Sequence, residues 1–535
     1  MKANKLITTK YGNKILVNSI YDEKDKLMKL DWTITHRAWN QEHKGFIVDY
    51  TLESLEALEN IHCVVNQDLL DPLLKEEEKK AESLKESNAM TSNLDIPVND
   101  GLKYLPFQKA GIEYINKRKS CLLSDDMGIG KTIQAIGLVN LNQDSMNKIL
   151  IVCPASLKLN WEKELNKWLV KKDYEIQVIF PTDKFKESAN IYIINYALLN
   201  RHKENFKNYE FDLIIADESH KLKNGKALRS KAFFKIKGKR KLFLSGTPFL
   251  NRPVELFTVL KSVGLFTNWL KFVTRYCGAY KDRFGWVVTG SSNLKELQQI
   301  LRENVMIRRL KKDVLSELPD KIRQTISIQT KSKEMKLIKQ EKDLYNDYLN
   351  AQNEIRILKQ QGLETGVVAD KMRLVFSELA KLRHDVAVIK IPFIINFISD
   401  ALENGNKIVL FAHHKDVTRA VHDAFKEISV TIVGETKSED RQKAVDKFQN
   451  NPDIKLFVGS ITACAEGITL TASSNVVFAE LAWQPAIMTQ SEDRCHRLGQ
   501  KNSVLVQYIT LQNSLDEYMA KMLEHKKEIF AEVMN

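Results

Sequence analysis

The clearest chemistry in the chain lies in residues 124–132, which read SDDMGIGKT between a short apolar stretch and a helical pattern. Gly128 and Gly130 let backbone N–H groups approach a triphosphate, Lys131 would bind its β- and γ-phosphates, and Thr132 would ligate magnesium. The helix that follows adds the positive end of its dipole. The pattern predicts a phosphate-binding loop made of Asp126, Met127, Gly128, Ile129, Gly130, Lys131 and Thr132.

This loop departs from the strict pattern GxxxxGK[ST] at its first position, where Asp125 replaces glycine. The alternative interpretation is a glycine turn that happens to precede an amphipathic helix. A buried strand before the loop and a helix after it favour the phosphate loop.

A second apolar run ends in two carboxylates, in the sequence LIIADESH from residue 213 to 220. Asp217 would coordinate magnesium through water, and Glu218 would polarise the water that attacks the γ-phosphate. An acidic pair at the end of a strand also occurs as a simple cap. Because these carboxylates accompany Lys131, the sequence predicts an ATP hydrolase with ATP and Mg²⁺ as cofactors.

Residues 485–499 begin with proline and end with glycine, which is typical of a helix. Within it, Gln490, Arg494 and Arg497 stand at positions i, i+4 and i+7, so a continuous helix would place them on one face. Such a face could reach a γ-phosphate as an arginine finger. The alternative is an exposed arginine stripe, which the surrounding sequence QSEDRCHRLGQ disfavours.

Two series of short apolar runs must position these groups. The first comprises residues 121–124, 149–153, 191–194, 213–216 and 242–245, and the second comprises residues 408–412, 430–433, 456–459, 476–479 and 504–509. Continuous apolarity predicts strands buried on both faces, as in parallel sheets covered by helices. The fold class is therefore α/β with two similar domains. Residues 331–382 should be helical, and the charged residues 75–85 with the polar residues 87–93 should form a linker.

Composition points to a partner rich in phosphate. The chain has 81 Lys and Arg against 68 Asp and Glu, a net charge of +13. Ten of these cations and no carboxylate lie in residues 221–241, although a solvated surface is the alternative explanation for the overall excess. The six cysteines are scattered, so no zinc is expected. Without a signal peptide or an apolar run of bilayer length, the chain is expected to be a soluble intracellular protein with no membrane partner.

In order along the chain, these motifs resemble those of the Snf2 family within helicase superfamily 2. The matching segments are LPFQ (105–108) with motif Q, SDDMGIGKT with motif I, ILIVCPASLKLNWEKE (149–164) with Ia, INYA (194–197) with Ib, DESH (217–220) with II, LSGTP (244–248) with III, FAHH (411–414) with IV, residues 460–474 with V, and QSEDRCHRLGQ (490–500) with VI.

The sequence is most similar to the HARP-like branch of DNA-annealing and fork-remodelling translocases. The relevant segments are RYC (275–277), GSSNL (290–294), RRLK (308–311) with DVL (313–315), FAHHK (411–415) and FAEL (478–481). Residues 31–61, with Trp32 and Trp39, also resemble the small HARP module, and a generic α+β domain is the alternative.

The resemblance implies two RecA-like parallel-sheet lobes, helical insertions and a small N-terminal α+β accessory domain. The expected boundaries are 1–95 for the accessory domain and linker, 96–320 for the first lobe with a helical protrusion, 321–390 for a helical insertion, and 391–535 for the second lobe with a C-terminal helix. ATP would bind between the lobes. The expected ATP-binding residues beyond the phosphate loop are Gln108, Gly467 and Gln490, and the expected catalytic residues are Lys131, Asp217, Glu218, Arg494 and Arg497.

The resemblance further implies a monomeric, ATP-dependent translocase on double-stranded or branched DNA that remodels, anneals or branch-migrates it. The expected DNA contacts, made without base specificity, are Ser156, Lys158, Asn195, Tyr196, Lys221, Lys223, Thr469 and Trp483. A strand-separating helicase on DNA or RNA and a non-enzymatic DNA-binding scaffold are the alternatives. The expected location is the cytoplasm of a bacterium or of a phage host, or the nucleus if the source is eukaryotic.

Overall fold

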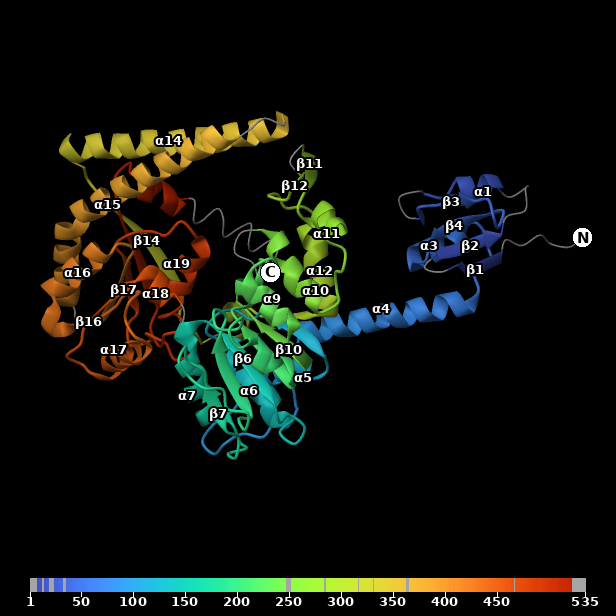
Figure 1. Cartoon of the computed structure of the whole chain (residues 1–535), viewed down its shortest axis with the longest axis horizontal. Helices are drawn as coiled ribbons and strands as arrows, with labels where there is room; N and C mark the ends of the chain where they lie inside the picture. Colours follow the sequence, from blue (N-terminus) through green and yellow to red (C-terminus); the bar gives the residue numbers. More distant parts are fainter. Residues whose placement is uncertain are drawn as a thin grey trace, which may run out of the picture. The chain divides into compact units, whose positions relative to one another are not determined.

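The structure is a computed structural model that describes residues 7–11, 14–18, 24–31, 35–246, 252–282, 285–315, 317–330, 332–361, 365–403, 405–465 and 467–521. The chain divides into two compact units, Met1–Lys85 and Glu86–Asn535 (Figure 1). Among the described residues, every helix is too short or too polar to cross a membrane.

The N-terminal unit is built on a small antiparallel sheet in the order β1-β2-β4-β3. Its strands are β1 (Ile7–Tyr11), β2 (Lys14–Asn18), β3 (Ala38–Asn40) and β4 (Gly45–Asp49), with helices α1 (Lys24–Met28) and α3 (Leu52–Asn60). Ile15, Val17, Phe46 and Val48 from the sheet form a core with the helices. This is the α+β fold expected for the accessory domain. Of its two tryptophans, Trp32 lies outside the described residues.

Helix α4 (Gln67–Ser87) occupies most of the segment that we interpreted as a linker. Charged residues support it, since Lys80 pairs with Glu76 at 3.2 Å and with Glu77 at 2.8 Å, one turn away. The run of charge is therefore the polar surface of a helix. In the described residues 88–105 there is neither helix nor strand.

The larger unit contains two parallel sheets, as predicted. Lobe 1 is the seven-stranded sheet with the order β13-β5-β10-β9-β6-β8-β7 and the helices packed on it. Its strands are β5 (Ser120–Leu123), β6 (Ile149–Cys153), β7 (Ile176–Val178), β8 (Ile191–Asn195), β9 (Glu210–Asp217), β10 (Lys237–Leu244) and β13 (Met306–Ile307).

Alternate residues of these strands enter two different cores, one on each face of the sheet. Ile149 and Ile151 of β6 belong to one core, whereas Leu150 and Val152 belong to the other. This is the physical reason for the uninterrupted apolar runs in the sequence. The main covering helices are α5 (Pro106–Asn116), α6 (Lys131–Leu141), α7 (Lys158–Trp168), α9 (Leu228–Lys235), α10 (Phe257–Ser262), α11 (Trp269–Tyr276) and α12 (Leu294–Asn304).

Lobe 2 is the six-stranded parallel sheet, in the order β14-β19-β18-β15-β17-β16, with its helices. Its strands are β14 (Lys321–Ile328), β15 (Ile408–Ala412), β16 (Ser429–Ile432), β17 (Leu456–Ser460), β18 (Asn475–Phe478) and β19 (Val504–Leu511). Helices α16 (Lys415–Ala424), α17 (Ser438–Asn450), α18 (Ile461–Cys464) and α19 (Pro485–Glu492) follow the strands.

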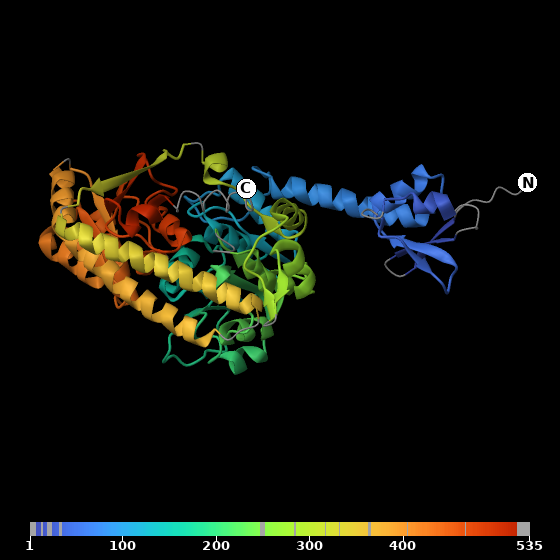
Figure 2. The same ribbon diagram turned by 90° about the horizontal axis from the view of Figure 1, so that it is seen from above.

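The region expected as a helical insertion, 321–390, differs from the prediction at both ends. It begins with β14, which pairs in parallel with β19 at the edge of the lobe 2 sheet. Two long helices follow, α14 (Ser332–Gln361) and α15 (Gly366–Glu403), and they run along each other (Figure 2). Because α15 continues to Glu403, the expected boundary at residue 390 falls inside a helix. Residues 515–521 are helical, as expected for the start of the predicted C-terminal helix, and the residues beyond Lys521 lie outside the described part of the chain.

Candidate active site

The phosphate loop follows β5 and ends where α6 begins. Gly128 and Gly130 have φ values of +80° and +92°, in the left-handed region that glycine adopts at low cost. Lys131 folds back over the loop, where its Nζ donates to the carbonyl oxygens of Asp125 at 2.7 Å and Asp126 at 3.1 Å. The loop therefore has the geometry in which backbone N–H groups and one ammonium can surround an anion.

Gln108 fixes this loop from the side. Its Oε1 accepts from the Leu105 backbone N–H at 2.9 Å, which makes it part of a cap on α5, and its Nε2 donates to the Ile129 carbonyl at 3.2 Å. Gln108 is buried. A Cβ atom at Gly130 would come within 2.5 Å of the Gln108 amide, so this glycine is also required for close packing.

The two carboxylates stand at the carboxyl end of β9. Asp217 accepts from Trp161 Nε1 at 2.9 Å and from the Glu218 backbone N–H at 2.9 Å. The Tyr196 hydroxyl donates to the Asp217 carbonyl at 2.6 Å. Glu218 has a φ of +50°, a left-handed conformation that is uncommon for a side-chain-bearing residue and is enriched at functional sites.

The two carboxyl groups are driven to different charge states. Burial, together with the neighbouring charge of Glu218, raises the pKa of Asp217 above its ordinary value. Burial acts in the same direction on Glu218, but His220, Lys131 and Arg494 outweigh it and hold the pKa of Glu218 below its ordinary value. Glu218 thus stays ionised and can accept hydrogen bonds. A cation bound at Asp217 would relieve the repulsion between the two carboxylates.

His220 connects this pair to the end of β10. Its Nδ1 lies 3.2 Å from Glu218 Oε2 and 3.4 Å from Ser245 Oγ. The neighbouring Gly246 approaches the phosphate loop closely, since a Cβ atom there would lie 3.2 Å from Lys131 Nζ. The remaining residues of the motif III segment, Thr247 and Pro248, lie outside the described residues.

The helix expected over residues 485–499 is shorter than predicted. Helix α19 ends at Glu492, and the backbone N–H groups of Arg494 and Cys495 bond to carbonyls three residues back rather than four. The expectation of a single helical face for Gln490, Arg494 and Arg497 is therefore wrong. The polar contacts of the neighbouring carboxylates Glu492 and Asp493, described below, accompany this change.

Arg494 and Arg497 nevertheless lie close together, because the same segment of lobe 2 binds both of them. Arg494 Nε donates to the Gln490 carbonyl at 3.0 Å, and its Nη1 donates to the Ile468 carbonyl at 3.3 Å. Arg497 Nη1 donates to Thr469 Oγ1 at 2.8 Å. Carbonyl and hydroxyl oxygens of the segment after α18 thus hold both guanidinium groups.

Lobe 2 contacts the phosphate loop through this turn. A Cβ atom at Gly128 would lie 2.5 Å from Arg497 Cβ, and the Leu498 backbone N–H points to the Gly128 carbonyl at 3.5 Å. Gly467, with φ +86°, packs against the Ser156 carbonyl, 3.0 Å from where its Cβ would be. The structure thus brings the predicted groups of both lobes to the same loop.

Sequence reasoning did not identify the role of the interlobe segment, residues 308–323. Arg309 and Asp125 are both 0% exposed and form an ion pair in which Arg309 Nε is 3.0 Å from Asp125 Oδ1. Arg308 Nη2 contacts Asp126 Oδ1 at 3.2 Å. Asp125, which departs from the strict phosphate-loop pattern, is therefore the residue that binds Arg309. The signal was present in the adjacent pairs Asp125–Asp126 and Arg308–Arg309.

The other end of the interlobe segment binds the carboxylates after α19. Lys311 Nζ lies 2.9 Å from Asp493 Oδ1, and Lys321 Nζ lies 2.9 Å from both Asp493 Oδ1 and Glu492 Oε2. Arg323 binds Glu492 through two nitrogens, at 2.6 and 3.2 Å. The segment therefore runs from the phosphate loop of lobe 1 to the arginine-bearing turn of lobe 2.

The expected DNA contacts of lobe 1 fall in different environments. Lys158 is 3% exposed, and its ammonium donates to the Ile179 carbonyl at 2.8 Å, so it does not reach an open surface. Tyr196 is also buried and supports Asp217. Asn195 Oδ1 accepts from the Leu198 backbone N–H. Ser156 faces Gly467 of lobe 2.

The basic tract 221–241 is divided between two places. Lys221 and Lys223 follow motif II, where Lys223 pairs with Glu255 at 3.0 Å. Lys239 and Arg240 lie instead in β10, where Lys239 binds Asp212 at 2.8 Å. The tract is therefore not one continuous face.

The two lobe 2 candidates are also engaged by the chain. Thr469 accepts from Arg497, as described above. Trp483 is 38% exposed and stacks on Tyr345 with ring centroids 6.2 Å apart, while the Arg383 guanidinium lies 4.7 Å from its ring. The ring surface of this indole is therefore already in contact with protein side chains.

The residues present fit a nucleotide with a divalent cation. The Lys131 ammonium donates hydrogen bonds to carbonyl oxygens of the loop, and it could exchange these acceptors for phosphate oxygens. Asp217 stands beside it at the end of β9. Within the described ranges, no three His, Cys, Asp or Glu side chains gather as a metal site. A cation at Asp217 would thus take most of its ligands from phosphates and water, which is how Mg²⁺ is usually bound beside nucleotides.

Comparison with known families agrees with this geometry. The model of the SNF2-related domain matches residues 38–385, and the model of the helicase conserved C-terminal domain matches residues 389–499. The first of these covers more than half of the chain. The chain belongs to the SNF2-related family, and the resemblance inferred from its motifs is confirmed.

The relatives include a protein named for DNA annealing, as expected from the resemblance. The human protein named DNA annealing helicase and endonuclease ZRANB3 is 35% identical over 453 residues, which cover 81% of this chain and 40% of that protein. The Xenopus laevis SWI/SNF-related matrix-associated actin-dependent regulator of chromatin subfamily A-like protein 1 is 34% identical over 513 residues, which cover 93% of this chain and 50% of that protein. The chain spans half or less of the length of these two relatives. A solved Sulfolobus solfataricus SWI2/SNF2 ATPase core in complex with dsDNA is 26% identical, covers 83% of this chain and 94% of that chain, and has a TM-score of 0.40.

Proposed function

We propose that this chain is a DNA-dependent ATPase that translocates along double-stranded DNA and uses that movement to anneal or remodel branched DNA. The observation that carries the proposal is the meeting of three groups at one loop: Lys131, the Asp217–Glu218 pair, and the turn that bears Arg494 and Arg497. The name of the human relative, DNA annealing helicase and endonuclease ZRANB3, supports the DNA-annealing use.

Each residue has a distinct part in the proposed reaction. Bound ATP with Mg²⁺ supplies the phosphoanhydride bond that is cleaved. Lys131 exchanges its carbonyl partners for phosphate oxygens, and Asp217 holds the cation. Glu218, kept ionised, accepts a hydrogen bond from the attacking water and orients it. Arg494 and Arg497 supply positive charge from lobe 2, as arginine fingers do.

The same contacts support coupling to movement. Because the arginine-bearing turn and the phosphate loop belong to different lobes, changes at the nucleotide would alter the contact between lobes. DNA held across both lobes would then be advanced by phosphate contacts that carry no sequence preference. Both halves of the site lie on one chain, which supports a monomer as the working unit.

The decisive experiment is the rate of ATP hydrolysis with no nucleic acid, double-stranded DNA, single-stranded DNA and RNA. Double-stranded DNA should stimulate most, and Lys131→Ala and Glu218→Gln should each remove the stimulated rate. Arg497→Ala should retain DNA binding but lose turnover by about 10³-fold or more. Lys295→Ala, an exposed change on α12, is the control.

Two other functions are separated by the same measurement. Strongest stimulation by RNA would indicate a strand-separating helicase of another branch. A DNA-binding scaffold would bind DNA while none of the three substitutions changed a rate. Retention of the stimulated rate in both Lys131→Ala and Glu218→Gln would refute the proposal.

A further inference from the structure

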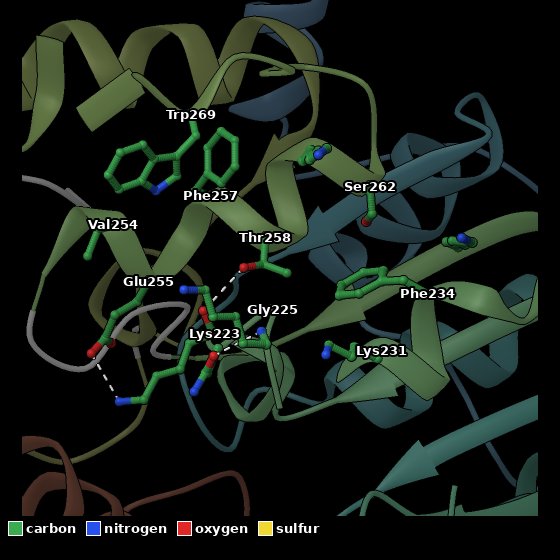
Figure 3. A pocket seen from close by; sticks show the side chains of 14 residues that line it. Lys223, Gly225, Lys231, Phe234, Val254, Glu255, Phe257, Thr258, Ser262 and Trp269 are labelled. Carbon is green, nitrogen blue, oxygen red and sulfur yellow. Dashed lines mark hydrogen bonds and ion pairs between the residues drawn. The ribbon is translucent and has the colours of Figure 1, made fainter. Parts of the chain in front are cut away.

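Lobe 1 contains a pocket of about 950 Å³ that the proposed ATPase reaction does not use. Its walls come from three stretches: the loop after motif II and helix α9, one residue of β10, and the segment that contains α10 and the first residue of α11. Figure 3 shows the labelled side chains that line it. This volume lies in the range of sites that hold a ligand of nucleotide size.

The charge of this pocket is strongly positive. It is lined by one carboxylate, Glu255, and by five lysines, namely Lys223, Lys226, Lys231, Lys241 and Lys261. Glu255 is already paired with Lys223. In the part of the chain that the structure describes, the other four lysines form no ion pair. Burial lowers the pKa of Lys241, so an anion next to it would stabilise its charged form.

The pocket also presents aromatic surface. Phe257, Phe234 and Trp269 belong to its lining, and Figure 3 shows Trp269 and Phe257 on one flank with Phe234 and Lys231 on the other. Trp269 is 37% exposed, although its backbone is fixed at the start of α11 by Asn268, whose side chain accepts from the Lys271 N–H at 3.1 Å. A site for phosphate alone would need no such surface.

We propose that this pocket binds an unpaired nucleotide of single-stranded DNA, with its phosphates against the lysines and its base against Trp269 or the phenylalanines. Lysine with aromatic surface is the combination that holds single strands without reading their sequence. A base inside a duplex is stacked on both faces, so it cannot enter a pocket. The proposal goes beyond the duplex-tracking function because it assigns a second DNA site to lobe 1.

The wall of the pocket is continuous with motif II. The short helix η3 (Ser219–Leu222) leads directly from Glu218 to Lys223, and Thr258 Oγ1 donates to the Lys223 carbonyl at 3.2 Å. A nucleotide that contacts Lys223 would therefore rest on the segment that carries His220. This provides a direct structural route by which a captured single strand could influence hydrolysis.

The proposal is tested by fluorescence anisotropy of a labelled oligothymidylate about ten nucleotides long, a length within usual single-strand site sizes. A duplex of equal length is measured in parallel, without ATP. Trp269→Ala should weaken single-strand binding by about tenfold, as expected from the loss of one stacked base, and Trp269→Phe should retain most of it. The matched control is Trp286→Ala, because Trp286 is 38% exposed but lies outside the pocket.

A second pair of variants tests the charge. Lys231→Glu combined with Lys261→Glu should reduce both the single-strand affinity and its dependence on salt, because fewer counterions are released. Lys295→Glu should not. Unchanged single-strand affinity in both pocket variants, with their melting temperatures preserved, would overturn the proposal. Equal losses for duplex and single strand would also overturn it and would make the pocket a duplex backbone contact.

This test is independent of the ATPase proposal. Lys131→Ala protein should bind the oligothymidylate as the unchanged protein does, since the pocket does not include the phosphate loop. If hydrolysis fails to depend on DNA but Trp269→Ala still weakens single-strand binding, the ATPase proposal fails and the pocket proposal stands. If hydrolysis depends on DNA but Trp269→Ala does not weaken single-strand binding, the ATPase proposal stands and the pocket proposal fails.

Discussion

The two ends of the interlobe segment are bound in contrasting ways. At the lobe 1 end, Arg309 and Asp125 are both 0% exposed, and Gln134 and the Phe107 carbonyl complete the polar contacts of the guanidinium. At the lobe 2 end, Lys311, Lys321 and Arg323 share Glu492 and Asp493. The cationic side chains there are 10, 13 and 27% exposed.

The contrast indicates which end would stay fixed in the proposed movement of the lobes. A planar guanidinium bound through two nitrogens has one favourable geometry, whereas an ammonium is a point charge that can exchange partners. The lobe 1 end is therefore a rigid mount for the phosphate loop. The lobe 2 end, where two of the three cations are lysines, is the place at which contacts can be remade.

Arg309→Met is the strongest way to break the fixed end. It leaves the Asp125 carboxylate buried without its cation, which typically costs about 3–5 kcal/mol in the free energy of unfolding. Urea denaturation followed by circular dichroism measures this loss. Arg373→Met is the matched control, because its partner Asp370 is 73% exposed and Arg373 itself is 78% exposed. The control should stay within about 0.5 kcal/mol of the unchanged protein.

The double variant Asp125→Ala with Arg309→Met sharpens this prediction. Removing both partners eliminates the uncompensated charge, so part of the lost stability should return. Gly111 supports the same interpretation, since a Cβ atom there would come within 2.5 Å of Arg309 Nη2. A single Arg309→Met variant as stable as the unchanged protein would contradict the rigid mount.

Glu492→Gln tests the shared end and should have a smaller effect. Glu492 is 0% exposed and binds Arg323, Lys321 and Tyr508, whose hydroxyl donates at 2.5 Å. The amide keeps hydrogen-bonding capacity but loses its charge, and both cations retain some exposure to water. We expect a loss of about 2–3 kcal/mol, measured by the same denaturation. Glu439→Gln, an exposed change on α17, should have little effect, and equal losses in the two variants would argue against the shared network.

The features that could be predicted from the sequence are those encoded by residues that are neighbours in the chain. The parallel sheets were predictable because strands such as β6 are apolar at every position. β14 was missed because none of its residues is fully buried: partly buried and exposed positions are mixed along it, as suits an edge strand. The end of α19 at Glu492 was missed because residues 492 and 493 are held by cations about 170 positions earlier in the chain. The partner of Asp125 lies 184 positions away, so the adjacent acidic and basic pairs were visible in the sequence but no local pattern showed that they meet.

Lys311→Met should be milder still. Lys311 Nζ also donates to the His496 carbonyl at 2.7 Å, but removing the ammonium also removes the cost of burying it. Lys321 remains bound to Asp493. The free energy of unfolding should therefore change by about 1 kcal/mol or less, measured by urea denaturation. A loss as large as that of Arg309→Met would show that the two ends are equally fixed.

The smallest effect concerns the charge of Lys311 itself. Burial, together with the nearby charge of Lys321, lowers the pKa of Lys311 to about 8 from 10.5, although Asp493 and Asp126 oppose this shift. Between these values the unfolded chain binds the proton that the folded chain has released. The contribution of Lys311 to the free energy of unfolding must therefore rise with pH across this window. Because other groups titrate in the same range, the quantity to measure is the difference between the unchanged protein and Lys311→Met from neutral pH upward. This difference should move in favour of the unchanged protein as pH rises. A flat or opposite trend would mean that Lys311 keeps its proton, and the lobe 2 end would then be an ion pair as fixed as Arg309–Asp125.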